Sequence, residues 1–161
     1  MSLEPSAALR QAMSRLATGV CVVTTTVDGH DHAMTANAFT SVSLEPPLVL
    51  LCVRLDSGFQ DAVSTARRWG VSVLAEEHRR IASWLSTPGR PLQGQLTRVP
   101  HHRGESGVVL LDGALATMEC ETVEEHVAGD HVIVVAEVVR ADHADSGSPL
   151  VYYRSTYTST R

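Results

Sequence analysis

The chain has 161 residues, the usual size of a single domain, and 43% of them are hydrophobic. Its formal net charge of −5 argues against a nucleic-acid partner, and its apolar runs are too short to cross a bilayer. The first residues have no cationic stretch followed by an apolar block, so we expect no secretory signal and a cytoplasmic location. All 13 Lys and Arg residues are arginines, which excludes Schiff-base chemistry through lysine.

The first part of the chain is predicted to form a helix and a hairpin. Leu9, Met13 and Leu16 recur at helical spacing, so residues 6–18 should form an amphipathic helix that covers an open end of a barrel. Residues 20–27, rich in Val and Thr, should form a strand that turns at Asp28-Gly29 into a second strand over 33–47.

This second strand, AMTANAFTSVSLEPP, is unusually rich in small hydrogen-bonding side chains. Strand alternation would place on one face Thr35, Asn37, Ser41 and Ser43, and on the other Met34, Ala36, Ala38, Val42 and Leu44. The polar face is either a shelf for a ligand or an ordinary solvent-facing surface, and alternation alone leaves both open.

The middle of the chain alternates strands and helices. Pro46-Pro47 should end the pairing, and the unbroken apolar run LVLLCV over 48–53 predicts a strand buried on both faces. Helices are expected over 57–65 and 76–86, the second with Ile81, Trp84 and Leu85 facing inward, and a strand over 69–74. Residues 87–107 carry three prolines and four glycines, which favours a mobile loop over a ligand.

The last part is predicted to be a long hairpin and one further strand. Asp112-Gly113 marks a turn, after which Ala114 to Glu121 alternate between an apolar and a polar face. The turn at 128–130 returns the chain into HVIVVAEVVRA, a strand apolar on both sides. Residues 142–149 should form a loop and 150–154 a strand, and the Ser/Thr-rich end should fray. About seven strands with short turns indicate a closed or nearly closed antiparallel barrel.

Neither the cysteines nor the histidines form a convincing metal site. Cys21, Cys52 and Cys120 stand far apart in apolar or strand-like runs, which is typical of reduced, buried thiols. The pairs His30-x-His32 and His101-His102 lie in predicted loops without a third ligand at suitable spacing. We therefore expect no metal.

Three blocks carry a resemblance to a known family: MTANAFTSVSLEPPLVLLCV, LDGALATMECETVEEHVAGDHVIVVAEVV and PLVYYR. In sequence and order they resemble the flavin reductase components of two-component flavin-dependent monooxygenases, the FMN-binding split-barrel family, from Leu9 to Tyr157. The resemblance implies one domain over 1–161, mainly β, an antiparallel Greek-key split β-barrel with a few peripheral helices, forming a homodimer. It also implies hydride transfer from NADH or NADPH to FMN or FAD, and delivery of reduced flavin to a separate monooxygenase.

A flavin needs partners for its polar ring edge and for its phosphate. The ring edge suits backbone amides and short Ser, Thr and Asn side chains. In this resemblance the flavin site comprises Thr35, Ala36, Asn37, Ala38, Ser41, Val42, Ser43, Cys52, Val53, Arg54, Ser57 and Phe59. Without a Gly-rich phosphate loop, hydroxyls, backbone N–H groups and arginine must hold the phosphate, and Arg54 and Ser57 are the candidates. Phe59 departs from the Thr or Ser common in the family, so we expect weaker flavin retention.

The triplet Gly129-Asp130-His131 is the second candidate site. By itself a Gly-Asp turn before a strand is typical of structure rather than catalysis. The resemblance places the triplet where the nicotinamide stacks on the flavin, which makes His131 the catalytic candidate, positioning the nicotinamide, while Asp130 fixes the turn. Hydride transfer itself needs close positioning of donor and acceptor rather than a general acid.

Two other interpretations of the function stay open. A flavin-binding carrier or redox sensor would keep the polar strand and Arg54 but need no nicotinamide cleft. An oxidase of a phosphorylated pyridoxine-like substrate would share the fold, but the absence of lysine makes its substrate site hard to build. The chain has no dinucleotide-binding Gly-rich fingerprint, which fits the resembled family.

Overall fold

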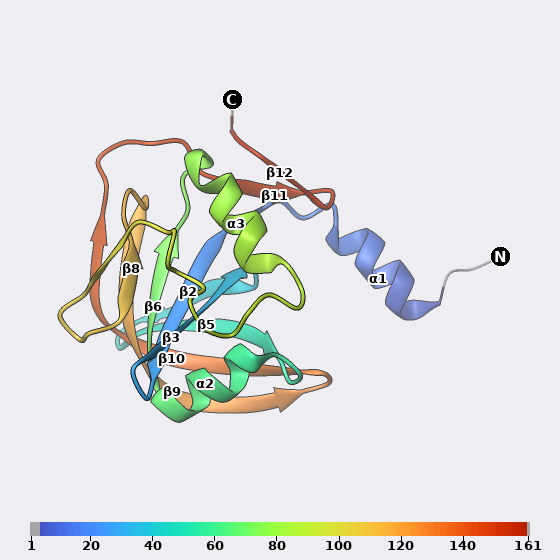
Figure 1. The fold of residues 1–161 in the computed structure, drawn as a ribbon. Helices are drawn as coiled ribbons and strands as arrows, with labels where there is room; N and C mark the ends of the chain where they lie inside the picture. Colours follow the sequence, from blue (N-terminus) through green and yellow to red (C-terminus); the bar gives the residue numbers. More distant parts are fainter. Residues whose placement is uncertain (1–3, 161) are drawn as a thin grey trace.

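The computed structural model describes residues 4–160 and is built mainly from antiparallel strands, with helices around them (Figure 1). The helices are α1 (Pro5–Met13), α2 (Gly58–Ala66), the 3-10 turn η1 (Glu76–His78) and α3 (Arg79–Ser86). The strands are β1 (Thr18–Gly19), β2 (Cys21–Val27), β3 (His30–Ala36), β4 (Phe39–Leu44), β5 (Pro47–Arg54), β6 (Arg68–Val73), β7 (His101–Arg103), β8 (Val109–Leu111), β9 (Ala116–Ala128), β10 (His131–His143), β11 (Val151–Tyr153) and β12 (Thr156–Thr158).

The main sheet has seven strands in the order β3-β2-β6-β9-β10-β5-β4, and every neighbouring pair is antiparallel. Two small sheets, β1-β11-β12 and β7-β8, accompany it. The prediction of a mainly β, antiparallel fold with few helices is confirmed. Within residues 4–160 no hydrogen-bonded ladder joins the edge strands β3 and β4, so the barrel is not closed by strand pairing.

The polar strand predicted over 33–47 is two strands, and the prediction of one continuous strand was wrong. β3 pairs with β2, whereas β4 pairs with β5 at the other end of the sheet. One straight strand cannot pair at both edges, so the chain breaks at Asn37-Ala38, where the carbonyl of Ala38 accepts from the N–H of Cys52 at 2.9 Å. Pro46 lies in the turn that links β4 to β5.

β5 is buried on one face only, which corrects the expectation of two buried faces. Val49, Leu51 and Val53 are buried, while the alternate residues, Leu48, Leu50 and Cys52, remain half-buried. The reason is its place one strand from the sheet edge, with the core against one side. A residue on its half-buried face is therefore within reach of a ligand or partner.

Two apolar clusters hold the fold together. The first lies under α2, which contributes Phe59 and Val63, and it includes the fully buried Trp69. The Trp69 indole N–H donates to the Thr122 hydroxyl at 3.1 Å, so burying this ring leaves no polar atom unpaired. The second cluster packs α3 and Leu96, from the segment after it, against β2 and β3.

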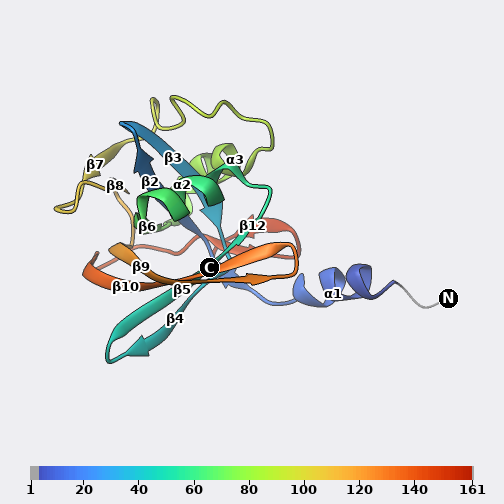
Figure 2. The ribbon, with the colours of Figure 1, turned by 90° about the horizontal axis from the view of Figure 1, so that it is seen from below.

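The predicted roles of two helices need correction. α1 ends at Met13 and extends away from the body, with no buried residue, instead of covering a barrel end (Figures 1 and 2). Its apolar side chains Leu9 and Met13 are 63% and 52% exposed because the helix contacts little of its own chain. In α3, Leu85 is buried as predicted, but Trp84 is 41% exposed, and its indole N–H donates to the Gln95 carbonyl at 3.0 Å.

Three further predictions about the second half are revised. Glu119, expected on a polar face of β9, is only 3% exposed because loop 104–107 covers it. The irregular segment after α3 ends at Pro100, where β7 begins, and its Leu96 and Val99 are buried. Residues 156–158, expected to fray, instead form β12, which pairs with β11. None of the described helices combines the length and apolarity needed to span a membrane.

Candidate functional site

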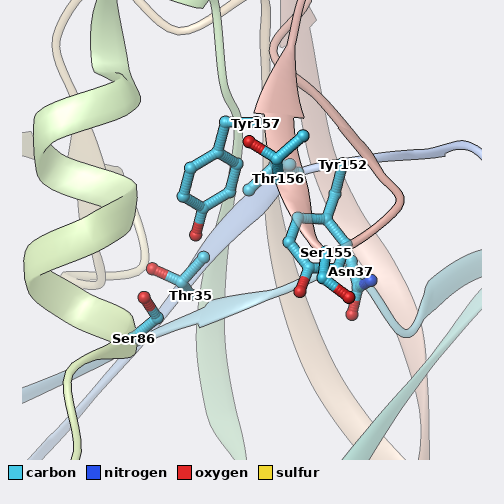
Figure 3. A pocket seen from close by; sticks show the side chains of 8 residues that line it. Thr35, Asn37, Ser86, Tyr152, Ser155, Thr156 and Tyr157 are labelled. Carbon is cyan, nitrogen blue, oxygen red and sulfur yellow. The ribbon is translucent and has the colours of Figure 1, made fainter. Parts of the chain in front are cut away.

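Two cavities adjoin β3: Thr35 lines the first and Ala33 lines the second. The first has a volume of about 500 Å³ and lies between the end of α3, β3 and the β11–β12 hairpin (Figure 3). Its lining is dominated by hydroxyl groups and one amide, from Thr35, Asn37, Ser86, Tyr152, Ser155, Thr156 and Tyr157. Such a set donates and accepts hydrogen bonds without carrying charge, which suits a polar heterocycle.

Two predicted site residues face this first cavity. The Thr35 hydroxyl donates to the carbonyl of Ala82 in α3 at 2.7 Å, which fixes its orientation and leaves its oxygen able to accept. The Asn37 side chain donates to the Thr18 hydroxyl at 3.3 Å and leaves its amide oxygen available. Both side chains thus line a cavity, while the role of the polar strand as a ligand shelf stays a prediction.

The β11–β12 hairpin completes the first cavity, and sequence reasoning missed it. The Tyr152 and Tyr157 rings lie with centroids 5.5 Å apart at a tilt of 58°. The turn between the strands uses left-handed backbone at Arg154 and Ser155 without a glycine, so it carried no turn signal. The three tyrosines Tyr152, Tyr153 and Tyr157, close together near the chain end, were the available clue.

The second cavity, of about 510 Å³, lies where β5 runs into α2 and is closed by the segment after α3. The predicted residues Arg54, Ser57 and Phe59 all line it. Ser57 is the N-cap of α2, and its hydroxyl oxygen accepts from the Phe59 N–H at 3.2 Å. The Phe59 ring is buried in the core, so the position offers its backbone rather than a hydroxyl.

The two arginines of the second cavity differ in their surroundings. Arg54 donates from Nε and NH2 to both carboxylate oxygens of Asp56, at 2.9 and 2.7 Å. The hydrogen bond from Arg54, with its charge, holds the pKa of the Asp56 carboxyl below its ordinary value. Arg90, which sequence reasoning did not select, donates to the carbonyl oxygens of Ala33 and Thr87. Only its place in a Gly/Pro-rich segment after a helix could have marked it.

The cavities adjoin along two stretches of chain. Ala33 lines the second cavity and Thr35 the first, about 7 Å apart along a strand. Likewise Ser86 lines the first and Pro88 the second. The two cavities therefore lie next to each other along β3 and beyond the end of α3.

The Gly129-Asp130-His131 triplet lies beside the second cavity. His131 pairs with Arg54 across β10 and β5, and the Asp130 carbonyl accepts from the Leu55 N–H at 3.0 Å. The His131 Nδ1 lies 2.7 Å from an Asp130 carboxylate oxygen, and this hydrogen bond lowers the pKa of Asp130. The His131 Nε2 has no hydrogen-bond partner within residues 4–160.

The remaining predicted residues are not gathered around either cavity. Ser41 pairs with Val49, roughly 16 Å along β5 from Arg54, and Val42 is bulged and exposed. Ser43 accepts from the Glu45 N–H in the β4–β5 turn. The others belong to β3, to the break and to β5: Ala36, Ala38, Cys52 and Val53.

The cysteines and histidines form no metal site in the described part of the chain. The three cysteines are free, and no group of three His, Cys, Asp or Glu side chains could hold an ion there. His102 instead lies 2.6 Å from the Asp112 carboxylate, and His101 bonds the Val99 carbonyl.

The chain is similar over most of its length to known flavin reductases. The sequence profile of a family described as flavin reductase like domain matches residues 13–161. An NADH-dependent flavin reductase of a Rhodococcus species is 38% identical over 154 residues, covering 94% of this chain and 84% of its own. The reductase component of a Thermus thermophilus 4-hydroxyphenylacetate 3-monooxygenase is 35% identical, covering 93% of both chains.

Solved structures of flavin reductases have the same fold as this chain. BorF, the flavin reductase component of a bacterial two-component tryptophan halogenase, superimposes with a TM-score of 0.90 at 40% identity, covering 96% of this chain and 97% of its own. The Streptomyces globisporus NADH:FAD oxidoreductase SgcE6, in complex with NAD and FAD fragments, superimposes with a TM-score of 0.91 at 31% identity. The match covers 98% of this chain and 95% of the SgcE6 chain.

Proposed function

Since the chain belongs to the flavin reductase like domain family, we propose that it transfers a hydride from NADH or NADPH to FMN or FAD. Relatives of similar length are named NADH-dependent reductases of flavin, FMN or FAD. When bound, the flavin supplies the hydride acceptor; the protein binds it, orients it and holds the nicotinamide in reach.

The observation that carries this function is the pair of adjoining cavities. The hydroxyl-lined cavity at Thr35 and Asn37 suits the uncharged polar edge of the isoalloxazine. The basic cavity at Ser57 and the N-terminus of α2 suits the phosphate, because the first N–H groups of a helix attract an anion. Together they match a flavin nucleotide in chemistry and in order along β3.

His131 is proposed to orient the nicotinamide and to stabilise negative charge that develops on the flavin. The Asp130 carboxylate fixes the imidazole through Nδ1, which points Nε2 away from that hydrogen bond. Asp130 serves as a positioning residue, since its own carboxylate is engaged and solvent-exposed.

The finer architecture is proposed as a Greek-key split barrel that forms a homodimer. Two apolar features are uncovered in the monomer: the stripe of Leu9 and Met13 on α1, and the β4–β5 hairpin, where Leu44 is 87% exposed (Figure 2). Apolar area of this kind favours association. Light scattering after gel filtration should give twice the monomer mass, and Leu44→Asp should shift the protein toward the monomer.

The acceptor of the reduced flavin is proposed to be a separate monooxygenase. Relatives named as reductase components of 4-nitrophenol and 4-hydroxyphenylacetate monooxygenases support this. A cytoplasmic location is the matching proposal, where NADH and the partner enzyme are available.

The test is oxidation of NADH or NADPH, followed by the absorbance of the reduced nicotinamide, with FMN, with FAD or without flavin. Turnover that depends on added flavin supports the reductase and reveals both preferences. Tight flavin binding without turnover would instead favour the carrier or sensor.

A further inference from the structure

The second cavity brings two arginines from distant parts of the chain to the start of α2. Arg54 comes from the end of β5 and Arg90 from the segment after α3. A cation whose charge the protein does not already balance binds a phosphate more strongly than one that is already paired with a carboxylate. The hydrogen-bond partners of the two guanidinium groups decide which one is available.

The charge of Arg54 is already balanced. Its guanidinium makes a two-point contact with the Asp56 carboxylate, and the side chains are 63% and 70% exposed. Solvent and Asp56 thus satisfy this group in the protein without a ligand. A phosphate near Arg54 would also approach the Asp56 carboxylate, which opposes binding.

The charge of Arg90 has no such balance. Its NH2 donates to the Ala33 carbonyl at 2.6 Å and its NH1 to the Thr87 carbonyl at 3.2 Å, and both acceptors are neutral. Across residues 4–160, Arg90 Nε is the one buried side-chain nitrogen or oxygen without a hydrogen-bond partner. Burial lowers the pKa of Arg90, since it disfavours the charged form. An anion at this point would supply the missing counter-charge.

The segment that carries Arg90 lies directly against the N-terminus of α2. A Cβ added to Gly58, the first residue of α2, would lie 3.3 Å from Leu92 Cδ2, two residues beyond Arg90. Ser57, Gly58 and Phe59 at the N-terminus of this nine-residue helix therefore line the same cavity as Arg90. A guanidinium and a helix N-terminus aimed at one space make a phosphate site.

We propose that Arg90, rather than Arg54, is the residue that binds the phosphate of the flavin nucleotide and lets the enzyme prefer FMN over riboflavin. This assignment rests on the proposed function, because it presumes that a flavin occupies the two cavities. It adds a specificity-determining residue on the segment that closes the site.

The experiment compares the dissociation constants of FMN and riboflavin, measured from the quenching of flavin fluorescence, in four proteins. These are the wild type, Arg90→Gln, Arg54→Gln and Arg98→Gln, the last an exposed arginine on the same segment outside the second cavity. Arg90→Gln should weaken FMN binding by about 10- to 100-fold, the usual worth of a charged hydrogen bond. Its riboflavin affinity should change by no more than about twofold, since riboflavin lacks the phosphate.

Arg54→Gln should lose less FMN affinity than Arg90→Gln, and Arg98→Gln should match the wild type. Arg90→Lys, which restores the charge without the planar fork, should recover part of the preference for FMN. Circular dichroism of each variant checks that the fold persists.

Four results would overturn the assignment. One is loss of the FMN preference in Arg54→Gln but not in Arg90→Gln. Another is equal weakening of FMN and riboflavin in Arg90→Gln, which would make Arg90 structural. A third is flavin-dependent turnover with an unchanged FMN preference in Arg90→Gln, which refutes the role of Arg90 alone. The fourth is a wild type that binds neither flavin and oxidises no NADH in their presence, in which case the proposed function fails as well.

Discussion

The N–H of Ala33 donates to the side-chain oxygen of Gln95, 62 residues later, at 2.9 Å. Ala33 belongs to β3, an edge strand with no neighbour on its outer side. The carbonyl of the same residue accepts from Arg90, so two side chains of one segment replace a missing strand. This pairing anchors the segment that closes the second cavity.

Gln95→Ala should therefore destabilise the protein more than an exposed glutamine on the same segment. The substitution leaves the buried N–H of Ala33 without a partner, which costs about 1–3 kcal/mol of unfolding free energy. Urea denaturation measures the change, with Gln93→Ala as the matched control because Gln93 is exposed. Equal stability of the two variants would contradict the anchoring role.

Glu119 predicts a loss of stability in acid. Burial pushes the pKa of Glu119 up, but hydrogen bonds from the Ser106 hydroxyl and N–H and the Glu105 N–H, with the charge of Arg140, lower it overall. Because the pKa of Glu119 in the folded protein is below its ordinary value of 4.5, the carboxylate adds to the free energy of unfolding above that pH. This stabilisation fades as the pH falls through the folded pKa.

Glu119→Gln should remove this contribution by placing an amide against donors. The unfolding free energy at neutral pH should fall by about 1–3 kcal/mol. The wild type should lose part of its advantage over the variant below about pH 4.5, as urea titrations across pH would record. Glu137→Gln, at an exposed position of β10, is the control, and an unchanged pH profile in Glu119→Gln would refute the assignment.

The three cysteines should differ in reactivity. Burial raises the pKa of the Cys21 and Cys120 thiols to about 12, from 9.0. Their thiolate population falls about a thousandfold as a result, whereas Cys52 lies on the half-buried face of β5. A chromogenic disulfide should titrate one thiol rapidly in the native protein and three in denaturant. FMN should slow the fast reaction if Cys52 borders the flavin, and rapid reaction of all three thiols would be inconsistent with this burial.

His131→Ala should lower turnover more than flavin affinity. Loss of positioning of the nicotinamide should reduce kcat by about 10- to 100-fold, while the FMN dissociation constant stays within about threefold. Stopped-flow reduction of flavin by NADH separates the two effects. His126→Ala is a suitable control, because His126 is another exposed histidine bonded to a neighbouring carboxylate, Glu124. Unchanged turnover in His131→Ala would remove its proposed role.

Local patterns sufficed for much of the fold. The turns at Asp28-Gly29 and at 128–130, the helix capped by Ser57 and the long β9–β10 hairpin are set by residues close in sequence. The resembled blocks likewise pointed to the family from sequence alone, and the profile match over 13–161 confirms it.

Tertiary packing decided the rest, because it depends on contacts between residues far apart in the chain. The polar strand had to break at Asn37-Ala38 to reach opposite ends of the sheet, and the β11–β12 hairpin became the wall of a cavity. Composition marked Arg54 and Arg90 alike as cations. The carboxylate of Arg54 stands two residues later in the sequence, at Asp56, whereas only the fold shows that half-buried Arg90 lies against the neutral carbonyls of Ala33 and Thr87. The balance of a charge is set by its neighbours in space, and for Arg90 these include a residue far away in the chain.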